Sequence, residues 1–216
     1  MICWSCEREA GPGALCASCK ALQPPDDKAD FFAVLGLPSR YAIDLDAAES
    51  AFKKLSRQVH PDRFATGDPR ARKASLARTV QLNDAWRTLR DPVARAEYML
   101  ARAGIDIASE DGRKTGAPGG ELKGTVKVMA PPAFLLEILE LNDELSGALR
   151  AGDSVKAAFM AEEMRGRING SMQTIAEGLE AGTSDRLEEA GRALVALRYQ
   201  RRFLDAAEGK DTRTHG

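Results

Sequence analysis

Two amphipathic helical patterns on either side of His60-Pro61-Asp62 constrain the fold of this chain more than any other feature. Ahead of the tripeptide, apolar residues recur on one arc of a helix and basic residues lie on the opposite side. Pro61 is expected to end this helix, because its ring disfavours helical angles at the preceding residue. Asp46 and Glu49 predict a capping box at its start. The apolar positions are Leu45, Ala48, Phe52, Leu55 and Val59, and the basic positions are Lys53, Lys54 and Arg57.

A second helix is predicted across a polar loop, ending at Asp91-Pro92. The two helices would form a hairpin with a positive face and a polar tip. The positive face alone is typical of any solvated helix surface. A general-base role for His60 is disfavoured, since the only other histidine is His215 and no motif links His60 to a nucleophile. The apolar positions of the second helix are Leu76, Val80, Leu82, Trp86 and Leu89.

The stretch from Asp30 to Tyr98 resembles the J-domain, the module with which co-chaperones stimulate ATP hydrolysis by a DnaK-type chaperone. Residues 31–37 (FFAVLGL), the basic helix, the tripeptide and residues 82–92 (LNDAWRTLRDP) carry the resemblance. In that family the tripeptide and the basic helix contact the ATPase domain of the chaperone and its linker. The resemblance therefore implies a chaperone-binding role for Lys53, Lys54, Arg57, His60, Pro61 and Asp62.

All four cysteines lie in residues 1–22, as two Cys-x-x-Cys pairs: Cys3 with Cys6, and Cys16 with Cys19. Two such knuckles can close a tetrahedron of thiolates around one zinc ion. Metal binding would supply the stability that so short a segment cannot obtain from burial. We expect one structural zinc ion in a closed site. Two disulfides or a redox pair are the alternatives, but a reducing compartment disfavours disulfides and no βαβ pattern supports a thioredoxin-like fold.

Charge and hydropathy exclude several classes of function. The 31 basic and 32 acidic residues nearly cancel, so no bulk attraction to nucleic acid or to a membrane is implied. Only Arg8 and Lys20 are basic in the cysteine segment, which weakens a nucleic-acid-binding interpretation of it. No apolar run approaches the roughly 18 residues of a transmembrane helix. With no visible signal or transit peptide we expect a cytoplasmic location, or the mitochondrial matrix only if a transit peptide is missing from this chain.

The predicted fold is all-α: a J-domain helical hairpin and a C-terminal three-helix bundle, preceded by a small zinc-knuckle segment. Residues 23–29 are interpreted as a linker and residues 30–103 as the J-domain, whose last helix ends at Gly104. Residues 104–130 are rich in Gly, Lys and small polar residues, which predicts a flexible linker with a short extended piece at 125–129. Residues 131–208 are predicted to form the bundle and residues 209–216 a disordered tail.

Two helices of the bundle carry a second apolar patch beside the stripe expected to face the core. On the first helix the core stripe is Phe134, Ile138, Leu141, Leu145 and Leu149, and the second patch is Leu135, Leu136 and Leu139, bordered by Glu140 and Asp143. On the last helix Val195, Tyr199 and Phe203 stand off the leucine stripe. Such a patch either packs within the protein or is offered to a partner, and periodicity leaves both interpretations open.

The helical continuation past Tyr98 and residues 134–141 (FLLEILEL) resemble the HscB-type co-chaperones of iron–sulfur cluster assembly. The resemblance implies that the bundle binds an IscU-type scaffold through Leu135, Leu136, Leu139 and Glu140, with Tyr199 joining the same surface. The cysteine segment is similar to an N-terminal extension of some eukaryotic members.

We therefore expect an adaptor rather than an enzyme. It would bind the scaffold and deliver it to a specialised, HscA-like DnaK-type chaperone while stimulating the chaperone's ATPase. Nucleic acid and membrane are not expected partners. Two alternatives remain: a general J-domain co-chaperone with another client, and a zinc-ribbon nucleic-acid-binding regulator.

Overall fold

The computed structural model describes residues 1–11, 13–107 and 126–210. The chain divides into two compact units, and the division falls within one helix, between Arg95 and Ala96. The elements are α1 (Phe31–Leu35), α2 (Leu45–Val59), the 3-10 helix η1 (Pro61–Phe64), α3 (Pro69–Arg90), α4 (Pro92–Arg102), β1 (Ile105–Ile107), β2 (Val126–Val128), α5 (Pro132–Ala151), α6 (Ser154–Ala181) and α7 (Ser184–Ala207). Within these described ranges, no helix has the length and apolar character needed to cross a membrane.

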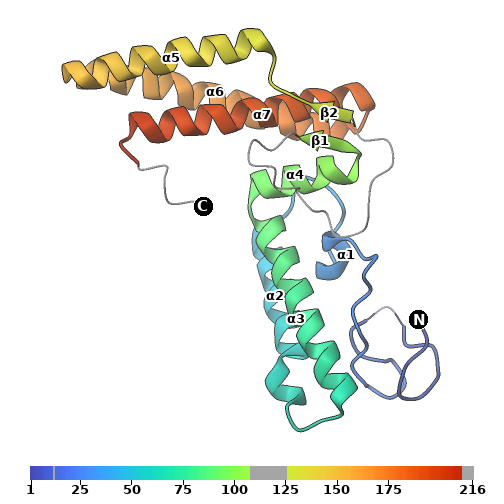
Figure 1. The fold of residues 1–216 in the computed structure, drawn as a ribbon. Coiled ribbons are helices and arrows are strands. Elements are labelled where there is room, and N and C mark those ends of the chain that lie inside the picture. Colours follow the sequence, from blue (N-terminus) through green and yellow to red (C-terminus); the bar gives the residue numbers. More distant parts are fainter. Residues whose placement is uncertain (12, 108–125, 211–216) are drawn as a thin grey trace. The chain divides into compact units, whose positions relative to one another are not determined.

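In the first unit α2 and α3 lie side by side, and α1 packs against both (Figure 1). The carboxylate of Asp44 accepts a hydrogen bond from the amide of Ala47 at 3.0 Å, so Asp44 caps α2. The capping box predicted at Asp46 and Glu49 is therefore wrong, because the helix begins one residue before Asp46. Asp68 caps α3 in the same way, ahead of Pro69 at the first helical position.

The core of this hairpin differs from the predicted one in part. Leu82 and Leu89 are buried as expected, and Phe52 stacks on Trp86 with ring centroids 5.3 Å apart. Leu76 and Val80, which were predicted to share this apolar face, are instead 59% and 60% exposed. The helical phase explains the difference, since Leu76 lies roughly 120° and Val80 roughly 160° around the axis from Leu82. In the first part of α3 the buried face is formed by small side chains: Ala71, Ala74 and Ser75.

The second unit contains the three predicted bundle helices, α5, α6 and α7, which lie against one another (Figure 1). Gly152 and Gly182 adopt the left-handed conformation, with φ of 70° and 68°, and end α5 and α6. Between α6 and α7, a Cβ added to Gly178 would lie 2.5 Å from the carbonyl oxygen of Arg186. Only glycine therefore permits this close approach of the two helices. The core cluster is Ile138, Leu145, Ala157, Met160, Met164 and Phe203.

The prediction of a flexible linker over 104–130 is wrong at both ends of that segment. β1 and β2 pair in parallel, with Ile105 opposite Val126 and Ile107 opposite Val128. The small sheet packs on α7 at Gly191, where an added Cβ would lie 3.0 Å from the Cγ2 atom of Ile105. The extended piece predicted at 125–129 is confirmed over Val126–Val128. The rest of the predicted linker, residues 108–125, lies outside the described residues, as does the predicted disordered tail from residue 211 onward.

Candidate functional site

The cysteine segment is built from two copies of one local structure, offset by 13 residues. In each copy the amide of the first cysteine donates to the carbonyl five residues on, at 2.8 and 2.9 Å. The amide four residues on donates back to the carbonyl of that cysteine, at 3.0 Å in both copies. The residue after the second cysteine has a positive φ in both, 59° at Glu7 and 62° at Lys20. Each Cys-x-x-Cys pair is thus turned back on itself, which brings its two sulfurs to the same side.

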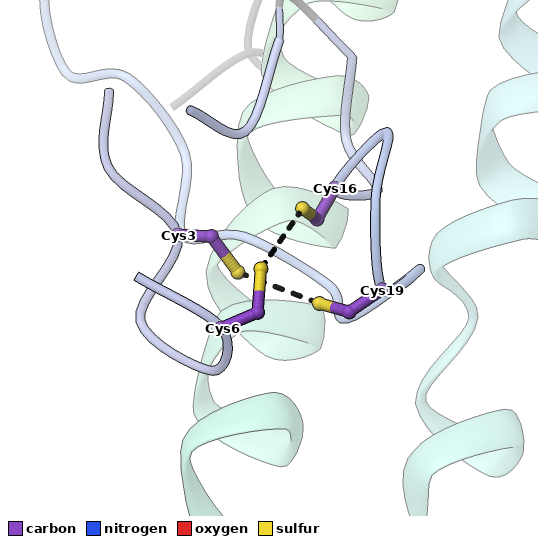
Figure 2. A group of neighbouring side chains, drawn as sticks. All are labelled: Cys3, Cys6, Cys16 and Cys19. Carbon is purple, nitrogen blue, oxygen red and sulfur yellow. Dashed lines mark hydrogen bonds between the residues drawn. The ribbon is translucent and has the colours of Figure 1, made fainter. Parts of the chain in front are cut away.

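The two knuckles bring all four cysteine Sγ atoms within 4.8 Å of one another. Figure 2 shows two of these approaches, Cys3 to Cys19 at 3.6 Å and Cys6 to Cys16 at 3.8 Å. A tetrahedron with metal–sulfur bonds of about 2.3 Å has edges of about 3.8 Å. The predicted cysteine cluster is therefore present, and its size suits a single tetrahedral ion.

Hydrogen bonds within this cluster shift the protonation of the thiols. Burial raises the pKa of Cys3, but hydrogen bonds from the backbone amides of Ser5 and Cys6 and from neighbouring thiols outweigh it and lower the pKa to about 6. The backbone amide of Arg8 acts to lower the pKa of Cys6, yet burial and the three neighbouring thiols raise it to about 12. Four sulfurs this close cannot all ionise unless a cation replaces their protons, which is the chemistry of a thiolate metal site.

Gln23 also belongs to this site, although it was predicted to begin a linker. Its side chain is 1% exposed, and its Nε2 atom donates to the Sγ atom of Cys3 at 3.2 Å. Nothing in the sequence marks Gln23, because its contact with the sulfur depends on how the second knuckle turns back toward the first.

The predicted chaperone-binding residues lie around the end of α2. His60 caps η1, with its Nδ1 atom accepting from the amide of Asp62 at 3.3 Å, and the Asp62 side chain is 90% exposed. Lys53, Arg57 and His60 line one groove of about 570 Å³ between α2 and α3. Lys54 instead lines a depression on the other flank of α2, beside α1. The structure thus groups Lys53, Arg57 and His60 and separates Lys54 from them, while the binding role of all six residues stays a prediction.

Besides Ser56 on α2, sequence reasoning missed two residues of this groove on α3, Thr79 and Asn83. They are one turn apart on the helix face that turns toward α2. Their spacing of four residues is typical of one helix face, but the apolar pattern of the sequence favoured a different face of α3.

The predicted scaffold-binding leucines are exposed on α5. Leu135, Leu136 and Leu139 are 39%, 62% and 58% exposed, and Glu140 is exposed beside them. In contrast, Ile138 and Leu145 on the same helix are buried in the bundle core. The second apolar patch of α5 is therefore exposed rather than packed in the bundle core, and its role in scaffold binding stays a prediction.

The corresponding patch of α7 is packed inside the bundle. Val195 and Phe203 are 6% and 1% exposed. Tyr199 is half-buried and meets the ring of Phe134 edge-on, with centroids 5.9 Å apart and an interplanar angle of 77°. Tyr199 thus stands next to the residue that precedes the exposed leucines, and its predicted role in scaffold binding is not tested by this contact.

Comparisons with known proteins agree with both units. A family model for the DnaJ domain matches residues 30–98, and a model for the HSCB C-terminal oligomerisation domain matches residues 130–208. Among solved structures, human co-chaperone protein HscB is similar over 98% of this chain and 99% of its own, with a TM-score of 0.75 and 25% identity. Chaperone HscB from Vibrio cholerae is similar in fold, with a TM-score of 0.61, 24% identity, and coverage of 84% of this chain and 96% of its own.

Proposed function

Because this chain is an HscB-type J-domain co-chaperone of iron–sulfur cluster assembly, we propose that it binds an IscU-type scaffold through α5 and delivers it to an HscA-like DnaK-type chaperone. The observation that carries the proposal is the leucine patch left exposed on α5 of a folded bundle, in the same chain as an exposed His60-Pro61-Asp62 tip. One surface suits a client, and the other suits the chaperone.

The α5 patch has the chemistry of a small protein-binding surface. Leu136 and Leu139 are each more than half exposed, and burying two such side chains against a partner is worth about 1–2 kcal/mol each. Glu140 and Asp143 are exposed at its edge. An acidic rim around an apolar centre selects a partner whose own apolar patch has basic neighbours. These features support the scaffold as the partner of this face.

The tip after α2 suits contact with an acidic partner surface. Lys53, Arg57 and His60 converge on one groove, and η1 holds the Asp62 carboxylate out in solvent. We infer that the basic groove orients the chaperone while Asp62 makes the contact that triggers hydrolysis. With both partners on one chain, the scaffold is presented at a high effective concentration to the chaperone.

We further infer that the four cysteines hold one zinc ion with a structural role. Cys3, Cys6, Cys16 and Cys19 offer four thiolates, the donor set that tetrahedral zinc prefers, and leave no coordination position for a substrate. Elemental analysis of the purified protein should give one zinc per chain. Replacement by cobalt should give the visible absorption bands of a tetrahedral thiolate site, whereas a metal-free protein with free thiols would refute the assignment.

Titration calorimetry against an IscU-type scaffold tests the function as a whole. We expect saturable binding by the wild type that is weakened at least tenfold in the Leu136→Ala/Leu139→Ala variant. Leu149→Ala is the matched control, since Leu149, which was wrongly predicted to lie in the core stripe, is a 49% exposed leucine on the same helix. If the wild type does not bind the scaffold, the proposal fails and the protein serves another client.

A further inference from the structure

Gln23 uses every polar group it has to join the cysteine cluster to the chain around it. Its Nε2 atom donates to the Sγ atom of Cys3 at 3.2 Å and to the carbonyl of Ala21 at 2.8 Å. Its Oε1 atom accepts from the amide of Trp4 at 3.4 Å, and its own amide donates to the carbonyl of Ala14 at 2.8 Å. A hydrogen bond to a thiolate stabilises the negative charge of a metal-bound sulfur and fixes its orientation.

The remaining polar group of Gln23, its carbonyl oxygen, faces helix α3. Arg78 donates from its Nε atom to this oxygen at 2.6 Å and from a second guanidinium nitrogen to the carbonyl of Pro24 at 3.0 Å. Gln81, three residues further along α3, donates to the carbonyl of Asp26 at 2.9 Å. The segment predicted to be a linker is thus held along one face of α3.

Arg78 is only half-exposed in this arrangement. Burial lowers its pKa, with the charge of Asp26 acting in the opposite direction. A guanidinium taken partly out of water needs its acceptors, because losing them leaves a desolvated charge. These hydrogen bonds therefore stabilise both the segment that carries the two carbonyls and the part of α3 around Arg78.

The cysteine segment has few other contacts: Leu22 is buried, and the guanidinium of Arg70 on α3 lies over the Trp4 ring, 5.9 Å from its centroid. Its buried cluster is Cys3, Ala10 and Cys16, with Cys6 and Ala21 packed at the edge. So small an apolar core does not offset the entropy of ordering about 20 residues without a metal. Loss of the metal would free Gln23 and remove the acceptors of Arg78 at the same time.

We propose that Gln23 and Arg78 couple the metal centre to helix α3, so that metal loading stabilises the J-domain and α3 in turn slows metal loss. Gln23 is a positioning residue for the Cys3 sulfur, and Arg78 acts on the metal only through Gln23. This inference rests on the proposed metal site. The inference adds to that site a contribution of the cysteine segment to the stability of the J-domain.

The first test uses the wild-type protein alone. Hydrogen exchange is followed by mass spectrometry with the zinc bound and after its removal by a chelator. We expect faster exchange after removal both in residues 1–22 and in the part of α3 around Arg78, with no change in α5. Unchanged exchange in α3 would overturn the coupling, even if the protein binds zinc.

The second test measures the rate of zinc release to a chromogenic chelator. Arg78→Met and Gln23→Met should each speed release by about 10- to 100-fold, the usual effect of losing an outer partner of a metal ligand. Lys73→Met, at an exposed position of α3, is the control. Release from Arg78→Met at the control rate would contradict the proposal.

Cobalt-substituted protein separates a positioning role from a general loss of stability. Removing the N–H donor from Cys3 in Gln23→Met should move the thiolate-to-cobalt charge-transfer band to lower energy. An unmoved band would show that Gln23 does not act on the sulfur. Wild-type protein that takes up neither zinc nor cobalt would overturn the metal site itself, an outcome distinct from all of those above.

Discussion

The hydroxyl of Ser75 on α3 donates a hydrogen bond to the carbonyl of Val59 at 2.5 Å. Val59 is the last residue of α2, so its carbonyl has no partner within the helix. Both residues are buried, at 0% and 1% exposed. The bond therefore fastens the end of α2 to α3 one residue before His60.

Ser75→Ala should lower the free energy of unfolding by about 1–3 kcal/mol, because it leaves a buried carbonyl without a donor. Urea denaturation of the full chain, followed by the fluorescence of Trp4 and Trp86, would measure it. Ser50→Ala on the exposed side of α2 is the control. Equal stability of the two variants would mean that water replaces the hydroxyl.

Asp62→Asn should abolish stimulation of the chaperone's ATPase and leave the fold and the scaffold affinity unchanged. The side chain is 90% exposed, so the change removes a charge without disturbing packing. Steady-state ATP hydrolysis measures the first effect and calorimetry the second. Asp46→Asn, which removes an exposed carboxylate near the start of α2, should keep most of the stimulation. Full stimulation by Asp62→Asn would exclude the tripeptide from the mechanism.

Gly178→Ala should destabilise the bundle by about 1–3 kcal/mol, the usual cost of overpacking. The added Cβ would lie 2.8 Å from that of Ala190 and closer still to the Arg186 carbonyl, so α6 and α7 must separate. Gly166→Ala on the same helix meets nothing within 4 Å and should stabilise by up to about 1 kcal/mol. Thermal unfolding by circular dichroism compares the two, and a shift of the same sign in both would contradict this packing.

Removal of the metal should leave scaffold binding unchanged within about twofold. The bundle has its own core, centred on Met164 and Phe203, and shares no residue with the cysteine cluster. Calorimetry with chelator-treated protein checks this prediction. A large loss of affinity would mean that the cysteine segment contributes to the scaffold surface.

Helical periodicity predicted the main helices, and the Cys-x-x-Cys spacing predicted the cysteine cluster, because both are local patterns. The start of α5 follows from Pro132, and the ends of α5 and α6 follow from Gly152 and Gly182, whose backbone preferences act without tertiary contacts. Periodicity alone could not decide which of the second apolar patches, on α5 and on α7, would be exposed and which would be buried. The structure buries Phe203 and exposes Leu136, because only one of the two faces another helix.

The parts that could not be predicted depend on contacts between distant residues. Ile105 and Val126 pair although they are 21 positions apart in the sequence, and both strands contact α7. Gln23 is ordered by the sulfur of Cys3 and by Arg78, which is 55 residues away. The sequence predicted an extended piece at 125–129 but could not show that it pairs with Ile105–Ile107.

The central claim is that one chain joins the scaffold to the chaperone, and single-turnover ATP hydrolysis by the chaperone tests it most directly. Wild-type protein and scaffold together should stimulate hydrolysis more than the sum of their separate effects. Leu136→Ala/Leu139→Ala should keep the stimulation seen without scaffold and lose the additional part. If this variant shows the full combined effect, the α5 patch does not join the two partners and the adaptor mechanism is wrong.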